Sequence, residues 1–343
     1  MKKILISDPT LRDGNHAVAH QLSAENFASY CKAADAAGIP IVEVGHGNGL
    51  GASTILVGEA KLTDEQILTI SRENLKTSKL GVLAVPGFCT IRQHLTQAVE
   101  LGVDVFRVAS HCTEADITQR HIDFVRKANK TAYGVLLMSH MASPAKLLEE
   151  AQKMASYGAQ AVMIFDSSGY YLPEDVTERI QTLVDNLDIP VGFHGHNNLG
   201  MAVMNSVAAV RAGASVIEGT IRGFGAGAGN TQLEVLVAVF NRLGWDTGID
   251  LYKVLDLAQL AEREFNPTPA SINPLAIVSG LAGVFSGFAR LVNKTANDYG
   301  VDSRDIFFEL GKRKAVAGQE ALILEVAQDL AKNTIHKTKP TPN

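Results

Sequence analysis

Two polar runs in the sequence carry side chains that suit a divalent metal ion. The first is DPTLRDGNH, residues 8–16, and the second is HGHNN, residues 194–198. His194 and His196 are two positions apart, so their side chains point to the same side of an extended strand. A carboxylate from the first run would complete a set of two imidazoles and one oxygen ligand. Such a set suits Mn²⁺, Mg²⁺ or Co²⁺ and leaves positions for water and a chelating substrate.

Each of these residues also has a simpler interpretation. A His-x-His pair in an apolar strand is often structural, Asp13 beside a glycine fits a turn, and Arg12 fits a surface cation. Both runs, however, follow apolar segments that are typical of buried strands. Their joint occurrence at the ends of two strands favours a metal site over the separate structural interpretations.

Short apolar, β-branched runs predict eight strands, and helical patterns separate them. Thr63–Gln66 and Thr90–Gln93 each fit a capping box, and Ser143 precedes a proline that suits the first position of a helix. Eight strands alternating with helices predict an α/β fold, a parallel (β/α)₈ TIM barrel. The strands are expected to begin near Ile4, Ile39, Leu80, Val103, Tyr133, Ala161, Ile189 and Val216.

Most predicted strands gain polar groups at their carboxyl ends. In a barrel these ends converge on one face, whereas a doubly wound open sheet gathers its polar groups at one switch point. The spread over nearly every strand favours the barrel, in which the first and seventh strands are separated only by the eighth. The polar groups are Asp8, Glu43, Arg107, His111, Ser139, His140, Asp166, His194, His196 and Glu218.

From about Asp250 onward the sequence shows only helical periodicity. We predict a TIM-barrel catalytic domain over residues 1–260, an appended C-terminal helical domain over 261–333 and a disordered tail over 334–343. The helical segments are 250–265, 274–292, 302–314 and 319–333, and FNPTPASINP, residues 265–274, is the expected break.

Composition narrows the class of protein. The chain has 343 residues, of which 46% are hydrophobic and 20% are charged, as in globular proteins with a large core. The net charge of −5 gives no general attraction to nucleic acid or to anionic membranes. The sequence has no apolar run long enough to span a membrane, and its three cysteines have no CxxC spacing. These features favour a cytoplasmic enzyme or binding protein.

The motifs as a group resemble those of the DRE-TIM metallolyases. The resemblance rests on DPTLRDG (8–14), on the His-x-His pair and on GFGAGAGN (223–230). Most members have glutamine two residues after the glycine of RDG, whereas this chain has His16. That residue, together with VEVGHGNGLG, SHCTEAD, LLMSHM and GKRKAVAGQE, is similar to the 4-hydroxy-2-oxovalerate aldolases within this superfamily. The similarity covers residues 4–330.

The resemblance implies a role for each site residue. Asp13, His194 and His196 would hold the metal, with Mn²⁺ favoured over Mg²⁺ or Co²⁺. Arg12 would donate to the keto oxygen, and His16 would deprotonate the C4 hydroxyl. The reaction would cleave a 4-hydroxy-2-oxo acid to pyruvate and a short aldehyde. The expected substrate-binding residues are Arg12, Ser167, His194 and Phe285.

Two further expectations concern the surroundings of the site. Phe285 stands where these aldolases have a tyrosine, so it keeps the ring and loses a hydroxyl; it is alternatively a packing side chain in a helix. Glu43 and Asp166 either orient the ligands or form a polar core network. His46 and His111 either line the aldehyde side or make hydrogen bonds at the barrel top. We assign the other histidines to the surface: His20, His94, His121 and His336.

The resemblance also implies a partner and leaves alternative functions open. The C-terminal helices resemble the region through which these aldolases dock an acylating acetaldehyde dehydrogenase. One alternative is a Claisen-type synthase that condenses an acyl-CoA with a 2-oxo acid, as glutamine-bearing relatives do. Another is a non-catalytic scaffold for the dehydrogenase. His16 favours the aldolase over the synthase, and GFGAGAGN is interpreted as a tight turn rather than a phosphate cradle.

Overall fold

The computed structural model describes residues 2–265 and 270–338, with side chains up to Lys332 in the last helix. Eight parallel strands pair in sequence order, and β1 pairs with β8 to close the barrel. The predicted TIM barrel is confirmed, and each strand begins within two residues of its expected start. The strands are β1 (Leu5–Leu11), β2 (Ile41–Val44), β3 (Lys79–Ala84), β4 (Val105–His111), β5 (Thr131–Leu137), β6 (Ala161–Asp166), β7 (Val191–Gly195) and β8 (Val216–Glu218).

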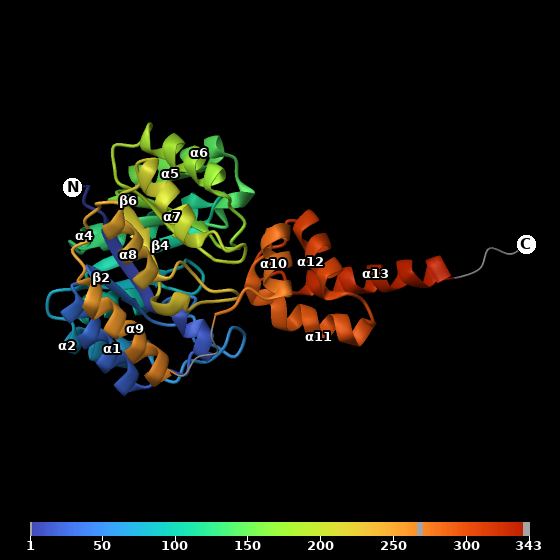
Figure 1. The fold of residues 1–343 in the computed structure, drawn as a ribbon, viewed down its shortest axis with the longest axis horizontal. Helices are drawn as coiled ribbons and strands as arrows, with labels where there is room; N and C mark the ends of the chain where they lie inside the picture. The colour runs from blue at the N-terminus through green and yellow to red at the C-terminus, as the bar shows by residue number, and fades with distance from the viewer. Residues whose placement is uncertain (1, 266–269, 339–343) are drawn as a thin grey trace, which may run out of the picture.

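Helices follow the strands and cover the outside of the barrel (Figure 1). A short 3₁₀ helix, η1 (Asp13–Val18), comes directly after β1 and places the first polar run at the barrel mouth. The outer helices are α1 (Ala24–Ala37), α2 (Asp64–Asn74), α3 (Thr96–Glu100), α4 (Gln119–Lys127), α5 (Pro144–Ser156), α6 (Pro173–Val184), α7 (Ala202–Arg211), α8 (Leu233–Arg242) and α9 (Leu251–Phe265).

The starts of these helices test the capping predictions. Thr63 caps α2 in a full capping box with Gln66, and Ser143 caps α5 ahead of its proline, as predicted. The capping box at Thr90 is wrong. A π-helical turn, Ile91–Leu95, follows Thr90, and the Thr90 N–H donates to the His94 ring at 2.9 Å. The His94 ring thus accepts the Thr90 N–H, which the predicted capping box assigned to the side chain of Gln93.

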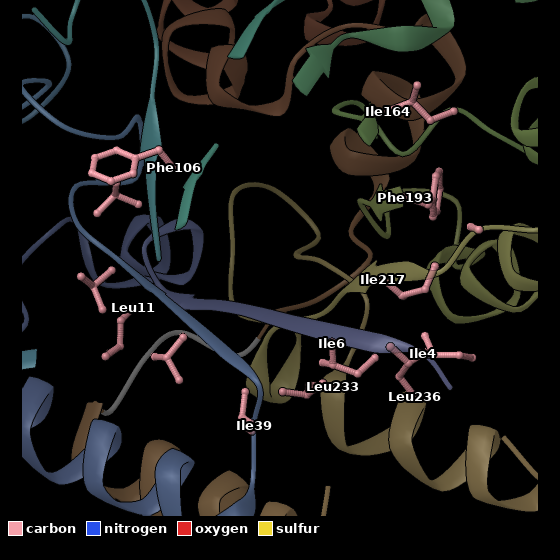
Figure 2. Close-up of a cluster of buried hydrophobic side chains, with 14 of the residues drawn as sticks. Ile4, Ile6, Leu11, Ile39, Phe106, Ile164, Phe193, Ile217, Leu233 and Leu236 are labelled. Carbon is pink, nitrogen blue, oxygen red and sulfur yellow. The ribbon is translucent and has the colours of Figure 1, made fainter. Parts of the chain in front are cut away.

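Two apolar layers hold the barrel together. The larger lies between the strands and the helices, where Figure 2 shows Ile6 of β1 and Ile217 of β8 near Leu233 of α8. Ile6 and Ile217 are also register partners in the sheet. A smaller cluster, which includes Leu83, Val135 and Met163, fills the inside of the barrel. The barrel is therefore packed throughout, and chemistry is confined to its mouth.

The C-terminal helices form a second body with its own core (Figure 1). They are α10 (Pro274–Ala282), α11 (Ala289–Tyr299), α12 (Ser303–Lys312) and α13 (Ala321–Thr338), with the short η6 (Ser286–Phe288) between α10 and α11. The predicted boundary at residue 260 falls inside α9, which packs on α1 of the barrel. The predicted tail begins inside α13, and residues 339–343 lie outside the described residues, as do 266–269 of the predicted break.

The helical segment predicted over 274–292 is interrupted in the structure. Gly283 adopts a φ of +64° and ends α10, and its N–H bonds back to the carbonyls of Ser279 and Gly280. This left-handed cap is a common helix end, and glycine adopts it without strain. The chain then turns through η6 before α11 begins, so Phe285 lies between two helices and not within one.

Candidate metal and acid–base site

The first and seventh strands bring three ligand-type side chains together. Asp13 lies in η1, just beyond β1, and His194 and His196 lie at the carboxyl end of β7. One potential ligand atom from each residue lies within 4.8 Å of the other two. All three side chains are buried. The geometry therefore brings together the three residues that the sequence analysis expected to share one cation.

The unpaired atoms of this group test whether a cation fits it. Asp13 Oδ1, His194 Nε2 and His196 Nδ1 are all buried, and none finds a hydrogen-bond partner among the described residues. A buried polar atom without a partner is costly, by about 1–3 kcal/mol. One cation bound by all three would remove that penalty at each atom. Two neutral imidazoles and a carboxylate are also a donor set that divalent first-row metals accept.

The protonation state of the group suits metal binding. Burial would raise the pKa of Asp13, but the Arg12 guanidinium and the nearby histidines hold it well below its usual range. Burial lowers the pKa of His194 and of His196, so both imidazoles are neutral at pH 7. A carboxylate and neutral imidazoles are the forms that bind metals.

A glutamate on the neighbouring strand orients His194. Glu218 Oε2 of β8 lies 3.0 Å from His194 Nδ1, which places the proton on Nδ1 and turns the free Nε2 toward Asp13. The ring of Phe165 stacks on His194 with centroids 4.3 Å apart and planes 19° apart. A carboxylate behind a histidine fixes its tautomer and direction, a common arrangement at metal sites.

Arg12 is held by three acceptors and has one free nitrogen. Its Nε donates to Glu43, and its Nη1 donates to Asp13 at 3.0 Å and to the carbonyl of Gly47 at 3.2 Å. Its buried Nη2 has no partner among the described residues. A guanidinium fixed in this way presents its remaining N–H groups to any oxygen that enters beside the metal ligands. Glu43 therefore orients Arg12.

His16 belongs to a cluster of three histidines at the barrel mouth. Its ring lies 4.8 Å from that of His20 and 6.4 Å from that of His46, and His20 and His46 stack at 3.7 Å. Burial lowers the pKa of His16 to about 4 and that of His20 to about 3. His16 is thus neutral at pH 7 and able to accept a proton.

The structure corrects or decides two other histidine assignments. The surface assignment of His20 is wrong, because its side chain is only 6% exposed, and the N–H of Gly47 donates to its Nδ1. The four-residue spacing of His16 and His20 did not predict this burial, because η1 ends at Val18 and the next two residues adopt positive φ values. Both ring nitrogens of His46 make hydrogen bonds, to the Gly58 carbonyl and the Asn48 N–H, as one of its two interpretations expected.

Of the two remaining predicted residues, Ser167 lies in the barrel and Phe285 lies in the C-terminal helical body. Ser167 follows β6, and its Oγ accepts a hydrogen bond from the N–H of Met138 at 3.0 Å. Phe285 precedes η6, and its ring packs edge-to-face on Phe288 in the C-terminal core, with centroids 6.1 Å apart. The structure thus brings Arg12 and His16 close to the group of Asp13, His194 and His196, whereas the contacts described for Ser167 and Phe285 are with other groups.

The glycine-rich run 223–230 closes on itself. Asn230 donates its backbone N–H to the Gly223 carbonyl and its side-chain amide to the Phe224 carbonyl. A side chain on Gly229 would collide with the Gly223 carbonyl, so the run requires glycine for close packing. These contacts support the tight-turn interpretation over a phosphate cradle.

Arg107 and Glu218 contact the site but were not predicted as site residues from the sequence. Both appeared only among the polar groups at strand ends, yet Glu218 contacts His194 and Arg107 contacts Glu218. A charged residue inside an apolar strand is rare unless it has a partner. That rarity was the available signal, but the partner depends on which strands face each other across the barrel.

Comparison with known families adds independent evidence. The HMGL-like family model matches residues 3–261, and the family model described as a DmpG-like communication domain matches residues 270–332. In the described ranges, no helix is both long and apolar enough to cross a membrane.

Two curated relatives cover nearly the whole chain. A 4-hydroxy-2-oxovalerate aldolase of Pectobacterium atrosepticum is 70% identical over 98% of this chain and 99% of its own length. One from Spirochaeta aurantia is 60% identical over 95% of this chain and 96% of its own. The relatives thus carry the same two parts in the same order.

Solved structures agree on the fold at much lower identity. The carboxyl transferase domain of Rhizobium etli pyruvate carboxylase superposes with a TM-score of 0.81 at 16% identity, covering 99% of this chain and 63% of that one. The HMG-CoA lyase of Bacillus subtilis superposes with a TM-score of 0.68 at 18% identity, covering 79% of this chain and 96% of that one. Both support the barrel architecture.

Proposed function

Because the chain belongs to the HMGL-like family and, within it, to the 4-hydroxy-2-oxovalerate aldolases, we propose that it is a metal-dependent carbon–carbon lyase acting on 4-hydroxy-2-oxo acids. The products are pyruvate and a short aldehyde. The proposal rests on one observation above all. Three buried ligand atoms without partners among the described residues lie beside an Arg12 nitrogen that also has none.

We propose Asp13, His194 and His196 as the ligands of the metal, with Mn²⁺ the favoured ion. When bound, a divalent ion supplies Lewis acidity to a carbonyl oxygen next to a carboxylate. The three residues fit this task because the carboxylate is ionised and both imidazoles are neutral at pH 7. Glu218 keeps His194 in the tautomer that turns Nε2 inward.

Arg12 and His16 carry the proton and charge movements of the cleavage. Arg12 Nη2 donates to the 2-oxo oxygen, which gains negative charge as the C3–C4 bond breaks; the aldehyde leaves, and the enolate is then protonated at C3 to give pyruvate. His16 accepts the proton of the C4 hydroxyl, because it is neutral at pH 7 and only partly buried. We further propose Ser167 and Phe285 as substrate contacts. Support for Phe285 comes from Gly283, two residues earlier, whose carbonyl accepts from His140 at the barrel mouth.

The function is tested by measuring pyruvate released from 4-hydroxy-2-oxovalerate after metal depletion and readdition of Mn²⁺, Mg²⁺ or Co²⁺. Pyruvate should form only with metal, and most rapidly with Mn²⁺. A panel of longer 4-hydroxy-2-oxo acids, run on wild type and Phe285→Tyr, tests the substrate contact. Free CoA released from acetyl-CoA and a 2-oxo acid, without pyruvate release, would instead indicate a Claisen-type synthase.

We propose that residues 270–332 bind an acylating acetaldehyde dehydrogenase that consumes the aldehyde. The match to the communication-domain family supports this assignment. Several large apolar side chains of these helices are exposed, and exposed apolar surface is typical of interaction sites. They include Ile277, Leu281, Leu291, Phe308 and Leu324.

Co-purification with the dehydrogenase tests this proposal. Leu281→Glu combined with Phe308→Glu should abolish the association while pyruvate release continues. Tyr252→Glu is the matched control, because Tyr252 is 81% exposed but lies on α9 of the barrel. Association that survives the double change and is lost in the control would place the interface on the barrel. The proposed location is the cytoplasm, and the three cysteines, all free and buried, support it.

A further inference from the structure

Arg107 lies in the middle of the barrel and connects groups from opposite sides. Its side chain is about 1% exposed, and its guanidinium forms ion pairs with Glu43 of β2 and Glu218 of β8. Arg107 itself belongs to β4, which stands opposite β8 in the ring of eight strands. The side chain therefore crosses the barrel interior to reach Glu218.

Both carboxylates that Arg107 binds serve the proposed site. Glu43 accepts a hydrogen bond from Arg12 Nε, and Glu218 holds His194 Nδ1 at 3.0 Å. Arg12 and His194 are thus the two ends of a buried chain in which basic and acidic side chains alternate. The chain runs in the order Arg12, Glu43, Arg107, Glu218 and His194.

A second contact joins Arg107 to His194. The guanidinium carbon lies 5.6 Å from the centroid of the Phe165 ring, and that ring stacks on His194. Glu43, Arg107, Phe165 and Glu218 come from β2, β4, β6 and β8, so they form one layer built from alternate strands. Such layers normally hold apolar side chains, whereas this one is largely ionic.

Charge explains why the layer needs an arginine at its centre. Two buried carboxylates are stable only if a cation compensates them, and Arg107 is the cation that contacts both. Its planar fork also presents separate N–H groups to separate partners, which a lysine does not. Removal of this cation would loosen Glu43 and Glu218 together.

We propose that Arg107 is a positioning residue that sets the geometry of Arg12 and of His194 at the same time. It acts on Arg12 through Glu43, and on His194 through Glu218 and Phe165. It acts through these neighbours rather than by direct contact with the metal or the substrate. The predicted effect on catalysis rests on the proposed function, whereas the predicted effect on metal binding does not.

The test uses the full-length protein with Arg107→Met and Arg107→Lys. Arg72→Met is the matched control, because Arg72 also loses an ion pair, to Asp104 at 2.9 Å, on the outside of the barrel. Two quantities are measured for each variant: the Kd for Mn²⁺ by calorimetry, and kcat at saturating Mn²⁺. Glu218→Gln interrupts the path from Arg107 to His194, and Glu43→Gln interrupts the path from Arg107 to Arg12, so these two variants separate the two effects.

Arg107→Met should weaken Mn²⁺ binding by about 10–100-fold, the usual effect of losing an outer partner of a metal ligand. It should also lower kcat at saturating Mn²⁺. Glu218→Gln should reproduce mainly the first effect, and Glu43→Gln mainly the second. Adding Arg107→Met to Glu218→Gln should weaken Mn²⁺ binding less than the product of the single effects, because coupled residues are not additive. Arg107→Lys should recover part of both losses.

A folded Arg107→Met protein whose Kd for Mn²⁺ and kcat both stay within about twofold of wild type would overturn the proposal. If Arg107→Met does not fold, Arg107→Lys decides, since it keeps the charge but cannot bridge two carboxylates with one fork. Wild-type values in Arg107→Lys would then overturn it. A wild-type protein that binds Mn²⁺ but releases no pyruvate contradicts the proposed function, and the Kd measurements still test Arg107.

Discussion

Arg12 Nη1 lies 3.0 Å from Asp13 Oδ2, so two neighbours in the chain fold back to form a buried ion pair. The same Oδ2 lies 3.6 Å from His194 Nε2, while the buried Oδ1 has no partner among the described residues. A single turn after β1 thereby places the Arg12 guanidinium beside a proposed metal ligand.

Arg12→Lys should abolish most of the lyase activity while the fold remains. Lysine keeps one positive charge but loses the fork that binds Glu43, Asp13 and the substrate oxygen together. Loss of one donor to a developing oxyanion lowers kcat by about 10²–10³-fold. Steady-state kinetics at saturating Mn²⁺ measures this, with the melting temperature as the check on folding. A kcat within about tenfold of wild type, well short of that loss, would show that Arg12 is not that donor.

Gly47→Ala should disturb His16 without straining the backbone. The φ of Gly47 is not in the left-handed region, but a Cβ there would lie 2.3 Å from His16 Nε2. The imidazole must therefore move. We expect kcat to fall and the Kd for Mn²⁺ to stay unchanged. An unchanged kcat would show that the position of His16 does not limit the reaction.

Gly87→Ala is the matched control for this collision. Gly87 has a φ of +108°, and no heavy atom lies within 4 Å of the place where an added Cβ would stand. The substitution therefore strains the backbone without displacing a neighbour. Stability should fall in this variant while kcat stays close to that of wild type.

Asn198 should prove to be the main polar link between the barrel and the C-terminal helices. Its fully buried amide donates to the Ala276 carbonyl and to the hydroxyls of Ser279 and Ser286. Asn198→Ala removes these bonds, while Ser279 and Ser286 still contact each other, so the free energy of unfolding should fall by about 0.5–1.5 kcal/mol for each bond that is not replaced. Urea titration measures the loss. Wild-type stability in this variant would show that apolar contacts alone hold the two bodies together.

The contact between His140 and Gly283 should respond to acid. The His140 ring nitrogen Nε2 lies 2.8 Å from the Gly283 carbonyl, and burial lowers the pKa of His140 to about 4. In the unfolded chain the pKa is about 6.5, so between these values the unfolded chain binds more protons. The contribution of His140 to stability is therefore complete above about pH 6.5 and is lost as the pH falls toward about 4.

His140→Gln tests this dependence, because glutamine keeps an N–H donor and does not titrate. Urea unfolding of both proteins is compared at several pH values between about 7 and 5, within the window that the two pKa values define. The difference between wild type and variant should shift in favour of the variant as the pH falls. Parallel pH profiles would mean that His140 does not contribute to the acid response.

The sequence was sufficient to predict the barrel and the grouping of Asp13, His194 and His196. Strand periodicity is local, and His194 and His196 need only their own strand to point the same way. Asp13 joins them because the first and seventh strands of a closed barrel are near neighbours. These features follow from short-range sequence patterns together with the closure of eight strands into a barrel, which brings the first and seventh strands near each other.

The sequence did not predict the features of the site that depend on contacts between residues far apart in the chain. Glu218, Arg107 and Glu43 meet only because even-numbered strands face one another inside the barrel. His20 is buried because two consecutive residues, Ala19 and His20, adopt positive φ values, which no residue pattern announced. The break at Gly283 was hidden because the apolar pattern continues across it.

We propose that one divalent cation, held by Asp13, His194 and His196, is required for cleavage of a 4-hydroxy-2-oxo acid. The most direct measurement is pyruvate release from 4-hydroxy-2-oxovalerate as Mn²⁺ is titrated into metal-depleted wild type and His196→Ala. We expect wild-type activity to rise from zero with the occupancy of one Mn²⁺ per chain, and we expect the variant neither to bind Mn²⁺ tightly nor to release pyruvate. Full activity in the metal-depleted protein, or in the variant, would contradict it.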